Sequence, residues 1–293
     1  MSLMGYILFG LMMFVIFLYF NFPYQRVKAM LVNAFQSSVP AQLIIDTIEV
    51  KPPLSLAGRK VLVTADLNGK PIELLRADRV VLRFLPLSWI QGKRSLRLDV
   101  QAYGGMIYTM MNINNLINPI NKPLEIVIQG VNLGRHTVLR AGVAKELGGL
   151  LEGEIKFHPR PGGLRESQLG GQLTASNVVI EGIRNLPVNP GRLTFSKIEC
   201  VVALSDGILH VAPLRAKGPE VEGTLEGTLS LGDQLRTSII NMHGSVLIKP
   251  ILAQKLGPIL HMLRQSRGAA KEIPFLLTGT LDHPNLRLSR IKF

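Results

Sequence analysis

The sequence predicts a mainly β protein, in which one N-terminal transmembrane helix precedes an antiparallel, curved β-sheet shaped like a groove, with a few amphipathic helices. Two observations predict this fold class. From Met1 to Gln25 the chain has no Lys, Arg, Asp or Glu, and beyond this stretch apolar and polar residues alternate in many short runs. Alternation with period two places one face of a strand on a core and the other in water. The intervals between the runs are too short for crossover helices, which favours antiparallel hairpins.

The uncharged N-terminal stretch predicts an uncleaved membrane anchor over residues 1–23. Leu3–Phe22 is almost wholly apolar, and a helix of this length rises about 30 Å, the thickness of the hydrocarbon core of a bilayer. A cleaved signal peptide is the competing interpretation, but no basic segment precedes the apolar run and bulky residues occupy its end. The residues expected to contact lipid include Leu8, Phe9, Leu11, Phe14, Ile16, Phe17 and Leu18.

Residues 24–36 are predicted to form a juxtamembrane amphipathic helix. Four apolar residues have the spacing of one helical face; they are Val27, Met30, Leu31 and Ala34. This face can lie on the membrane or cover the first strands of the following domain. Both arrangements satisfy the pattern, and we favour the second.

Residues 37–293 are predicted to form the β-rich domain, with a candidate internal boundary near residues 131–150. The clearest strand is Val221–Leu231, where odd positions hold Val, Gly or Leu and even positions hold Glu, Thr or Ser. Asn68-Gly69 predicts a tight hairpin, and Pro71–Leu85 reads as a pair of strands. The strands expected to share one apolar surface are 43–47, 61–67, 96–102, 124–129, 173–180, 193–204, 221–231 and 275–288.

Short segments of the domain resemble one another. GGQLTAS, EGTLEGTLSL and TGTLDHPNLRL share a Gly-x-Leu beginning. Repeated hairpins of this kind indicate an extended, concave sheet whose length grows by repetition.

Two helices are predicted within the domain, and the second is expected to cover the apolar surface. The first is Gly134–Leu151, with Gly148-Gly149 at its end. The second is Pro250–Arg267, whose apolar stripe consists of Leu252, Leu256, Ile259 and Leu263. If the helices leave part of the surface open, it forms a groove suited to acyl chains or to an apolar protein segment. The candidate groove residues are Leu98, Val100, Val221, Leu225 and Leu229.

No catalytic, metal-binding or nucleotide-binding motif is present in the sequence. The six histidines are scattered, and no two stand at metal-ligand spacing beside a carboxylate or Cys. Neither a nucleophile elbow nor a phosphate-binding glycine loop occurs. Cys200 is the only cysteine and alternates with apolar neighbours, which is typical of a buried strand residue. We therefore expect a protein that is not an enzyme and that has no cofactor or metal.

The charge of the chain favours a place near a membrane surface. All 33 Lys and Arg and all 20 Asp and Glu lie beyond the anchor, which gives the remaining chain a net charge of +13. Anionic headgroups attract such a domain, although a basic surface without a specific ligand is equally consistent. Few aromatic residues and no nucleic-acid-binding motif argue against a nucleic-acid partner. Arg26 and Lys28 directly follow the anchor, and the positive-inside rule alone places the domain in the cytoplasm.

The series of segments along the chain resembles a known family. FPYQRVKAML follows the anchor, then come GGLLEGEI and the long run GRLTFSKIECVVALSDGILHVAPLRAKGPEVEGTLEGTLSL, then IKPILAQKLGPILHML and the terminal PFLLTGTLDHPNLRL. This series is similar to type II secretion system protein N (GspN), a family with AsmA-like β architecture. The resemblance covers nearly the whole chain and is strongest from about Leu147 to Leu288.

The resemblance implies a place and a role. It implies a single-pass protein of the bacterial inner membrane, with the bulk of the chain in the periplasm, that serves as an accessory component of the type II protein secretion system. Its expected partners are inner-membrane lipids and other secretion components. The related AsmA-like proteins imply an alternative, a phospholipid-binding or lipid-transfer module with phospholipid in the apolar groove. The implied orientation is opposite to the one that Arg26 and Lys28 favour, and we follow the resemblance.

Overall fold

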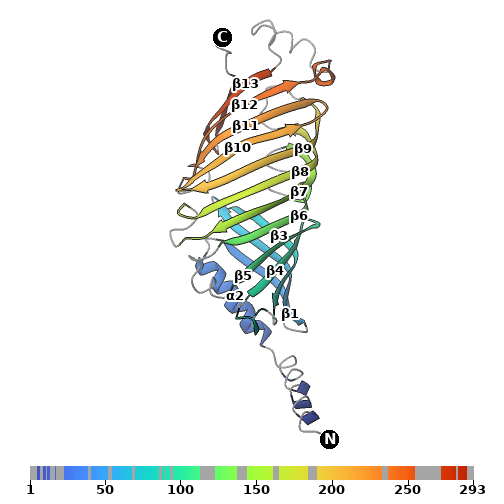
Figure 1. The fold of residues 1–293 in the computed structure, drawn as a ribbon, viewed down its shortest axis with the longest axis vertical. Coiled ribbons are helices and arrows are strands. Elements are labelled where there is room, and N and C mark those ends of the chain that lie inside the picture. The colour runs from blue at the N-terminus through green and yellow to red at the C-terminus, as the bar shows by residue number, and fades with distance from the viewer. Residues whose placement is uncertain are drawn as a thin grey trace.

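A computed structural model shows one long sheet built from consecutive hairpins (Figure 1). The structure describes residues 5–6, 9–10, 12–13, 17, 23–38, 41–51, 55–67, 70–85, 88, 90–92, 95–112, 123–136, 144–160, 165–183, 190–232, 237–254, 272–281 and 283–288. Its elements are α2 (Tyr24–Ser38), β1 (Gln42–Lys51), β2 (Ser55–Leu67), β3 (Lys70–Phe84), β4 (Ser95–Ala102), β5 (Gly105–Asn112), β6 (Leu124–Asn132), η2 (Leu133–Arg135), β7 (Ala144–His158), β8 (Gln168–Ile183), β9 (Arg192–Ser205), β10 (Ile208–Lys217), β11 (Val221–Ser230), β12 (Ile239–Ile248), β13 (Glu272–Thr280) and β14 (Pro284–Leu288).

The fourteen strands pair in the order of the sequence, each antiparallel to its neighbours. Within the described residues, β1 and β14 each pair with one strand only, so the sheet is open. At about 4.8 Å between neighbouring strands, fourteen strands extend roughly 60 Å. Figure 1 shows them stacked along the long axis of the molecule, with α2 beside β1 at one end and β13 near the other. The predicted mainly β class and the antiparallel sheet are confirmed.

Tight turns set the register of several hairpins. Leu67 is the register partner of Lys70, which leaves two residues for the connection between β2 and β3, as Asn68-Gly69 predicts. Two further turns have positive φ at both central residues, 50° and 73° at Asp206 and Gly207, and 52° and 80° at Tyr103 and Gly104. This is the conformation of type I′ hairpin turns, whose twist matches that of the strands.

The predicted helix over Gly134–Leu151 is wrong. Only η2 is helical there among the described residues, as a single 3₁₀ turn, and β7 begins at Ala144. The glycines that read as a helix end lie inside β7, where φ of Gly149 is +130° and the register with β8 shifts. Gly149 therefore forms a bulge, and the long pairing with β8 outweighs the chance helical spacing of the leucines.

The segment Pro71–Leu85, predicted as two strands, is one long strand, β3. β3 pairs with β2 along its whole length and with β4 from Ala77 onward. The mixed pattern that suggested two strands comes from Asp78, where a bulge interrupts the register with β4. A bulge shifts which residues face the core, so one strand reads as two.

The helix predicted over residues 24–36 is present as α2, and it contacts β1. Val32 packs against apolar residues of the sheet, and the Lys28 ammonium donates a hydrogen bond to the Asp46 carbonyl at 3.1 Å. The predicted stripe is wrong in part, since Met30 and Leu31 are exposed. The helix is rotated so that Val32 faces the sheet.

The predicted anchor is described at a few residues only. Phe9 and Phe17 have helical backbone and exposed side chains, whereas the other five predicted anchor residues, Leu8, Leu11, Phe14, Ile16 and Leu18, lie outside the described residues. Over the part of the chain that is described, no helix combines the length and the apolar character needed to cross a bilayer.

Candidate binding groove

One face of the sheet, here called the inner face, is apolar in the C-terminal strands. Leu204, Leu209, Leu229 and Ile240 are successive register partners on β9, β10, β11 and β12. Partners in register project to the same face. The next row along the strands holds Val202, Val211, Gly227 and Met242. The rows therefore form an apolar band that runs across the strands.

The same face is apolar in the N-terminal strands. Val80, Val100, Ile107 and Ile128 are successive partners on β3, β4, β5 and β6. Two clusters of buried residues lie along this face, and Leu151 of β7 packs against both. The inner face is thus continuous from the N-terminal strands to the C-terminal strands.

All five candidate groove residues lie on the inner face. Leu98 and Val100 belong to β4, and Val221, Leu225 and Leu229 belong to β11. Val100 packs against the first cluster and Val221 is part of the second. Only Val221 is buried, and the other four side chains are partly exposed.

No second layer covers the inner face among the described elements. Among the described residues, the largest fully buried side chains are two serines, Ser167 and Ser238. Among the described elements, extensive contacts join only neighbouring strands, α2 with β1, and β7 with η2. Many inner-face side chains are partly exposed there, whereas Leu204, Val221 and Ile240 are buried.

The two predicted covering helices reach the inner face at opposite ends. Val32 of α2 packs against the first cluster. Residues 250–254 are helical, and Leu252 is buried in the second cluster, as the prediction requires of it. Leu256, Ile259 and Leu263 lie outside the described residues.

Glycines on the inner face are explained by close packing within the sheet. A Cβ on Gly244 would lie 2.7 Å from the Phe275 ring of the next strand. A Cβ on Gly227, where φ is +143°, would lie 2.6 Å from the Cα atom of Met242. Both positions therefore need glycine, because a neighbouring strand or ring occupies the space of a side chain.

The inner face offers little polar chemistry. Cys200 lies on β9 and is half-buried, and burial raises the pKa of its thiol, which keeps it protonated. Within the described ranges, no three His, Cys, Asp or Glu side chains are arranged to hold a metal ion. The described inner face therefore offers mainly apolar contacts.

The opposite face, here called the outer face, carries charged side chains and exposed apolar ones such as Val201 in the C-terminal strands, and it has a shallow hollow. The hollow has a volume of about 390 Å³ and is lined by residues of β9 to β12, where β10 bulges. The His243 ring lies 2.9 Å from the Glu226 carboxylate, and both side chains, which line the hollow together with His210, are well exposed to solvent.

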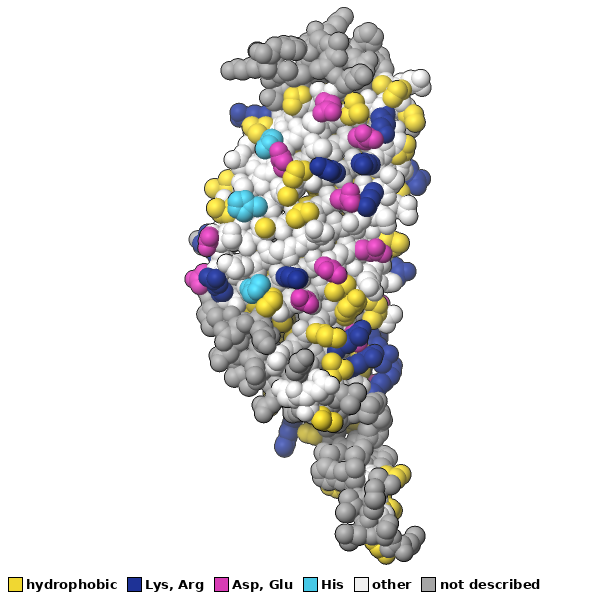
Figure 2. Space-filling model, viewed as in Figure 1, with side chains coloured by type: hydrophobic (Ala, Val, Ile, Leu, Met, Phe, Trp, Pro, Cys, Tyr) yellow, Lys and Arg dark blue, Asp and Glu magenta, His cyan; other side chains and the backbone are white. Residues whose placement is uncertain are grey.

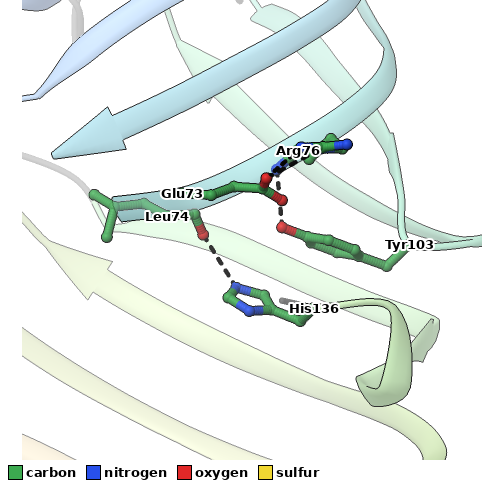
Figure 3. A network of polar contacts seen from close by, with 5 residues as sticks. All are labelled: Glu73, Leu74, Arg76, Tyr103 and His136. Atoms are coloured by element: carbon green, nitrogen blue, oxygen red, sulfur yellow. Dashed lines mark hydrogen bonds and ion pairs between the residues drawn. The ribbon is translucent and has the colours of Figure 1, made fainter. Parts of the chain in front are cut away.

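Polar contacts cover a free strand edge near the N-terminal end of the sheet (Figure 3). β3 extends beyond β4, so part of its edge has no strand partner on that side. There the Arg76 amide donates a hydrogen bond to the Tyr103 hydroxyl at 2.9 Å, and the His136 ring contacts the Leu74 carbonyl at 3.2 Å. The Tyr103 and His136 rings lie 4.9 Å apart. These two side chains take the place of a strand and satisfy the free edge.

No protein-family model, curated protein or solved structure matches this chain.

Sequence reasoning missed the polar residues that organise the outer face of β2 to β4. Asp99 is only 4% exposed and pairs with both Arg83 and Arg97, at 3.1 and 2.7 Å. The available signal was the alternation Arg-Leu-Asp at 97–99, which places Arg97 and Asp99 on one face of a strand. Register, which sequence alone does not give, brings Arg83 to the same place.

Proposed function

We propose that this protein is a non-enzymatic binding protein of the bacterial envelope, anchored in the inner membrane, whose inner face holds an extended apolar ligand. One observation supports this most strongly, the continuous apolar face that no second layer covers among the described elements. An exposed apolar surface of this size is costly in water and is typical of a binding surface.

Acyl chains of phospholipids are the ligand that the inner face fits best. Acyl chains need apolar contact and no hydrogen bonds, and the inner face supplies rows of mainly aliphatic side chains. At roughly 60 Å, the groove exceeds the thickness of one hydrocarbon core, so several lipids can lie along it.

The ligand can be tested in native membranes with the full chain. A photoreactive amino acid replaces Leu225 on the inner face, and the matched control replaces its neighbour Thr224, which is exposed on the outer face. We expect phospholipid adducts at Leu225 and none at Thr224. β11 lies roughly 50 Å along the sheet from β1, so an adduct there does not arise from the bilayer around the anchor. No adduct at Leu225, or equal adducts at both positions, would contradict lipid binding in the groove.

Accessory function in type II secretion is the second candidate, and the series of GspN-like segments supports it. In this role the inner face binds an apolar segment of another secretion component. The same photoreactive probe at Leu225 would then capture a protein of the secretion machine in place of lipid. Deletion of the protein would retain secreted enzymes in the periplasm. Normal secretion together with altered outer-membrane permeability would count against this role and for the lipid role.

A further inference from the structure

Four arginines on the outer face of β2, β3 and β4 form a cluster, here called the arginine patch; they are Arg59, Arg79, Arg83 and Arg97. The register places like charges directly opposite each other, Arg59 beside Arg79 and Arg83 beside Arg97. Like charges in this position destabilise a sheet unless an anion lies between them.

One of the two pairs is neutralised within the protein. The Asp99 carboxylate lies between Arg83 and Arg97 and accepts a hydrogen bond from Nε of Arg97 at 2.7 Å. The Arg97 guanidinium also lies 5.2 Å from the centre of the Tyr108 ring. Arg83 and Arg97 therefore have their anionic partner, Asp99, within the sheet.

The other pair is incompletely neutralised. Arg59 forms an ion pair with Glu49 at 3.2 Å. The Nε atom of Arg79 is buried and has no hydrogen-bond partner. A buried donor without a partner is costly, so among the described residues Arg79 is less well compensated than Arg83 and Arg97. The arginine patch thus has four cations against the two carboxylates of Glu49 and Asp99.

Exposed apolar side chains border the arginine patch on the same face. Met106 and Met110 of β5 are 38% and 57% exposed, and Ile44 of β1 is also exposed. Cations beside exposed apolar side chains are typical of surfaces that lie among lipid headgroups. On the outer face of β9 to β11, by contrast, Lys197 forms an ion pair with Glu199, and Glu222 forms one with Lys249. Figure 2 shows Lys and Arg gathered toward the lower right of the sheet, and both signs mixed above.

The arginine patch also lies near the predicted anchor. Lys28, early in α2, binds the Asp46 carbonyl, and the Asp46 carboxylate lies 3.8 Å from the ammonium of Lys60. Lys60 directly follows Arg59, a residue of the arginine patch, on β2. From β1 to β3 the sheet advances only about 10 Å.

We propose that the arginine patch binds phosphate groups of anionic lipid headgroups in the membrane that holds the N-terminal anchor. Guanidinium groups form two parallel hydrogen bonds to a phosphate, and the four guanidinium groups of the patch outnumber its two carboxylates. The exposed methionines enter the headgroup region beside it. This contact fixes the N-terminal end of the sheet against the membrane, independently of what the groove carries.

The test uses the full chain in lipid nanodiscs, with Cys200→Ala and an environment-sensitive dye on Met110→Cys. We expect a blue shift of dye emission in discs that contain phosphatidylglycerol, relative to discs of phosphatidylcholine alone. The double variant Arg59→Gln, Arg79→Gln should reduce this shift to roughly half or less. Salt at about 0.5 M should also weaken it, because screening shortens the reach of exposed charges.

Two controls separate this contact from general charge attraction. Lys197→Gln, Lys217→Gln removes the same charge from the outer face of β9 and β10, and it should leave the shift unchanged. A dye on Ile239→Cys, which is exposed on the outer face of β12, should report no shift. Circular dichroism checks that each variant keeps its β structure. Identical spectra in the two kinds of disc, or an equal loss with the lysine variant, would overturn the proposal.

Discussion

The N-terminal strands, β1 to β6, and the C-terminal strands, β8 to β13, share one face and differ in the other. Their inner faces both carry rows of aliphatic side chains. Their outer faces differ, since the arginine patch and exposed methionines mark the first region and balanced charges mark the second. The apolar inner face is therefore a feature of the whole sheet, whereas the excess of arginines on the outer face is confined to the N-terminal strands.

The largest effect is expected from a charge placed in the groove. In each region one inner-face residue is replaced, Val100→Arg in β4 or Leu225→Arg in β11, and lipid adducts are measured at a photoreactive Leu229. Burying a guanidinium among acyl chains is costly, so each variant should lower the yield about tenfold or more. An effect of Leu225→Arg alone would show that the two regions bind ligand separately, and unchanged adducts in both would contradict a lipid-filled groove.

Removal of Asp99 should destabilise the N-terminal strands most. Asp99→Ala leaves Arg83 and Arg97 facing each other without their buried carboxylate, and we expect a loss of about 3 kcal/mol in the free energy of unfolding. Denaturant titration measures it. The matched variant Glu199→Ala removes an exposed carboxylate that pairs with Lys197 in the C-terminal strands. It should barely move the midpoint, because exposed ion pairs contribute little.

Glycine substitutions test the close packing of the C-terminal strands. Gly227→Ala places a Cβ against β12 at φ of +143°, and should cost about 2 kcal/mol of unfolding free energy. Gly170→Ala in β8 is the control, because nothing lies within 4 Å of its Cβ position. Equal stability of the two variants in thermal unfolding would mean that the strands do not approach each other as closely as the structure has them.

The smallest effect is expected at the polar contacts of Figure 3. Tyr103→Phe removes the hydroxyl that accepts from the Arg76 amide, and should cost about 1 kcal/mol. Burial raises the pKa of Tyr103 above its ordinary value of 10.0, so the neutral phenol is favoured in the folded state. Its contribution is therefore complete below pH 10 and is lost as the pH rises further. In denaturant titrations, the difference in unfolding free energy between the unchanged protein and Tyr103→Phe should therefore shrink above pH 10.

The one-sided sheet could be predicted from sequence because alternation is local. Val221–Leu231 alternates without interruption, and it forms β11 as expected. The prediction failed where a bulge breaks the alternation, as at Gly149 in β7 and at Asp78 in β3. A positive φ or a register shift is a property of the pairing with the next strand, so one strand does not reveal it.

Some residues of the candidate sites could be predicted from the sequence, and others could not. The groove residues, such as Leu98 and Leu225, could be selected because apolar periodicity marks a face. The arginine patch could not, because Arg59 and Arg79 are neighbours only through the register of β2 with β3. Spacing along the chain gives no sign of this pairing.

The strictly sequential order of the sheet has a consequence for how the protein forms and changes. Every strand pairs with the one before it, so native contacts join segments that are close in sequence. Folding can proceed hairpin by hairpin, with a small entropic cost for each loop that closes. Duplication or loss of a hairpin would lengthen or shorten the ladder and leave the remaining pairings unchanged. The distance spanned from the N-terminal end of the sheet is thus a quantity that evolution can adjust in steps of about 10 Å per hairpin.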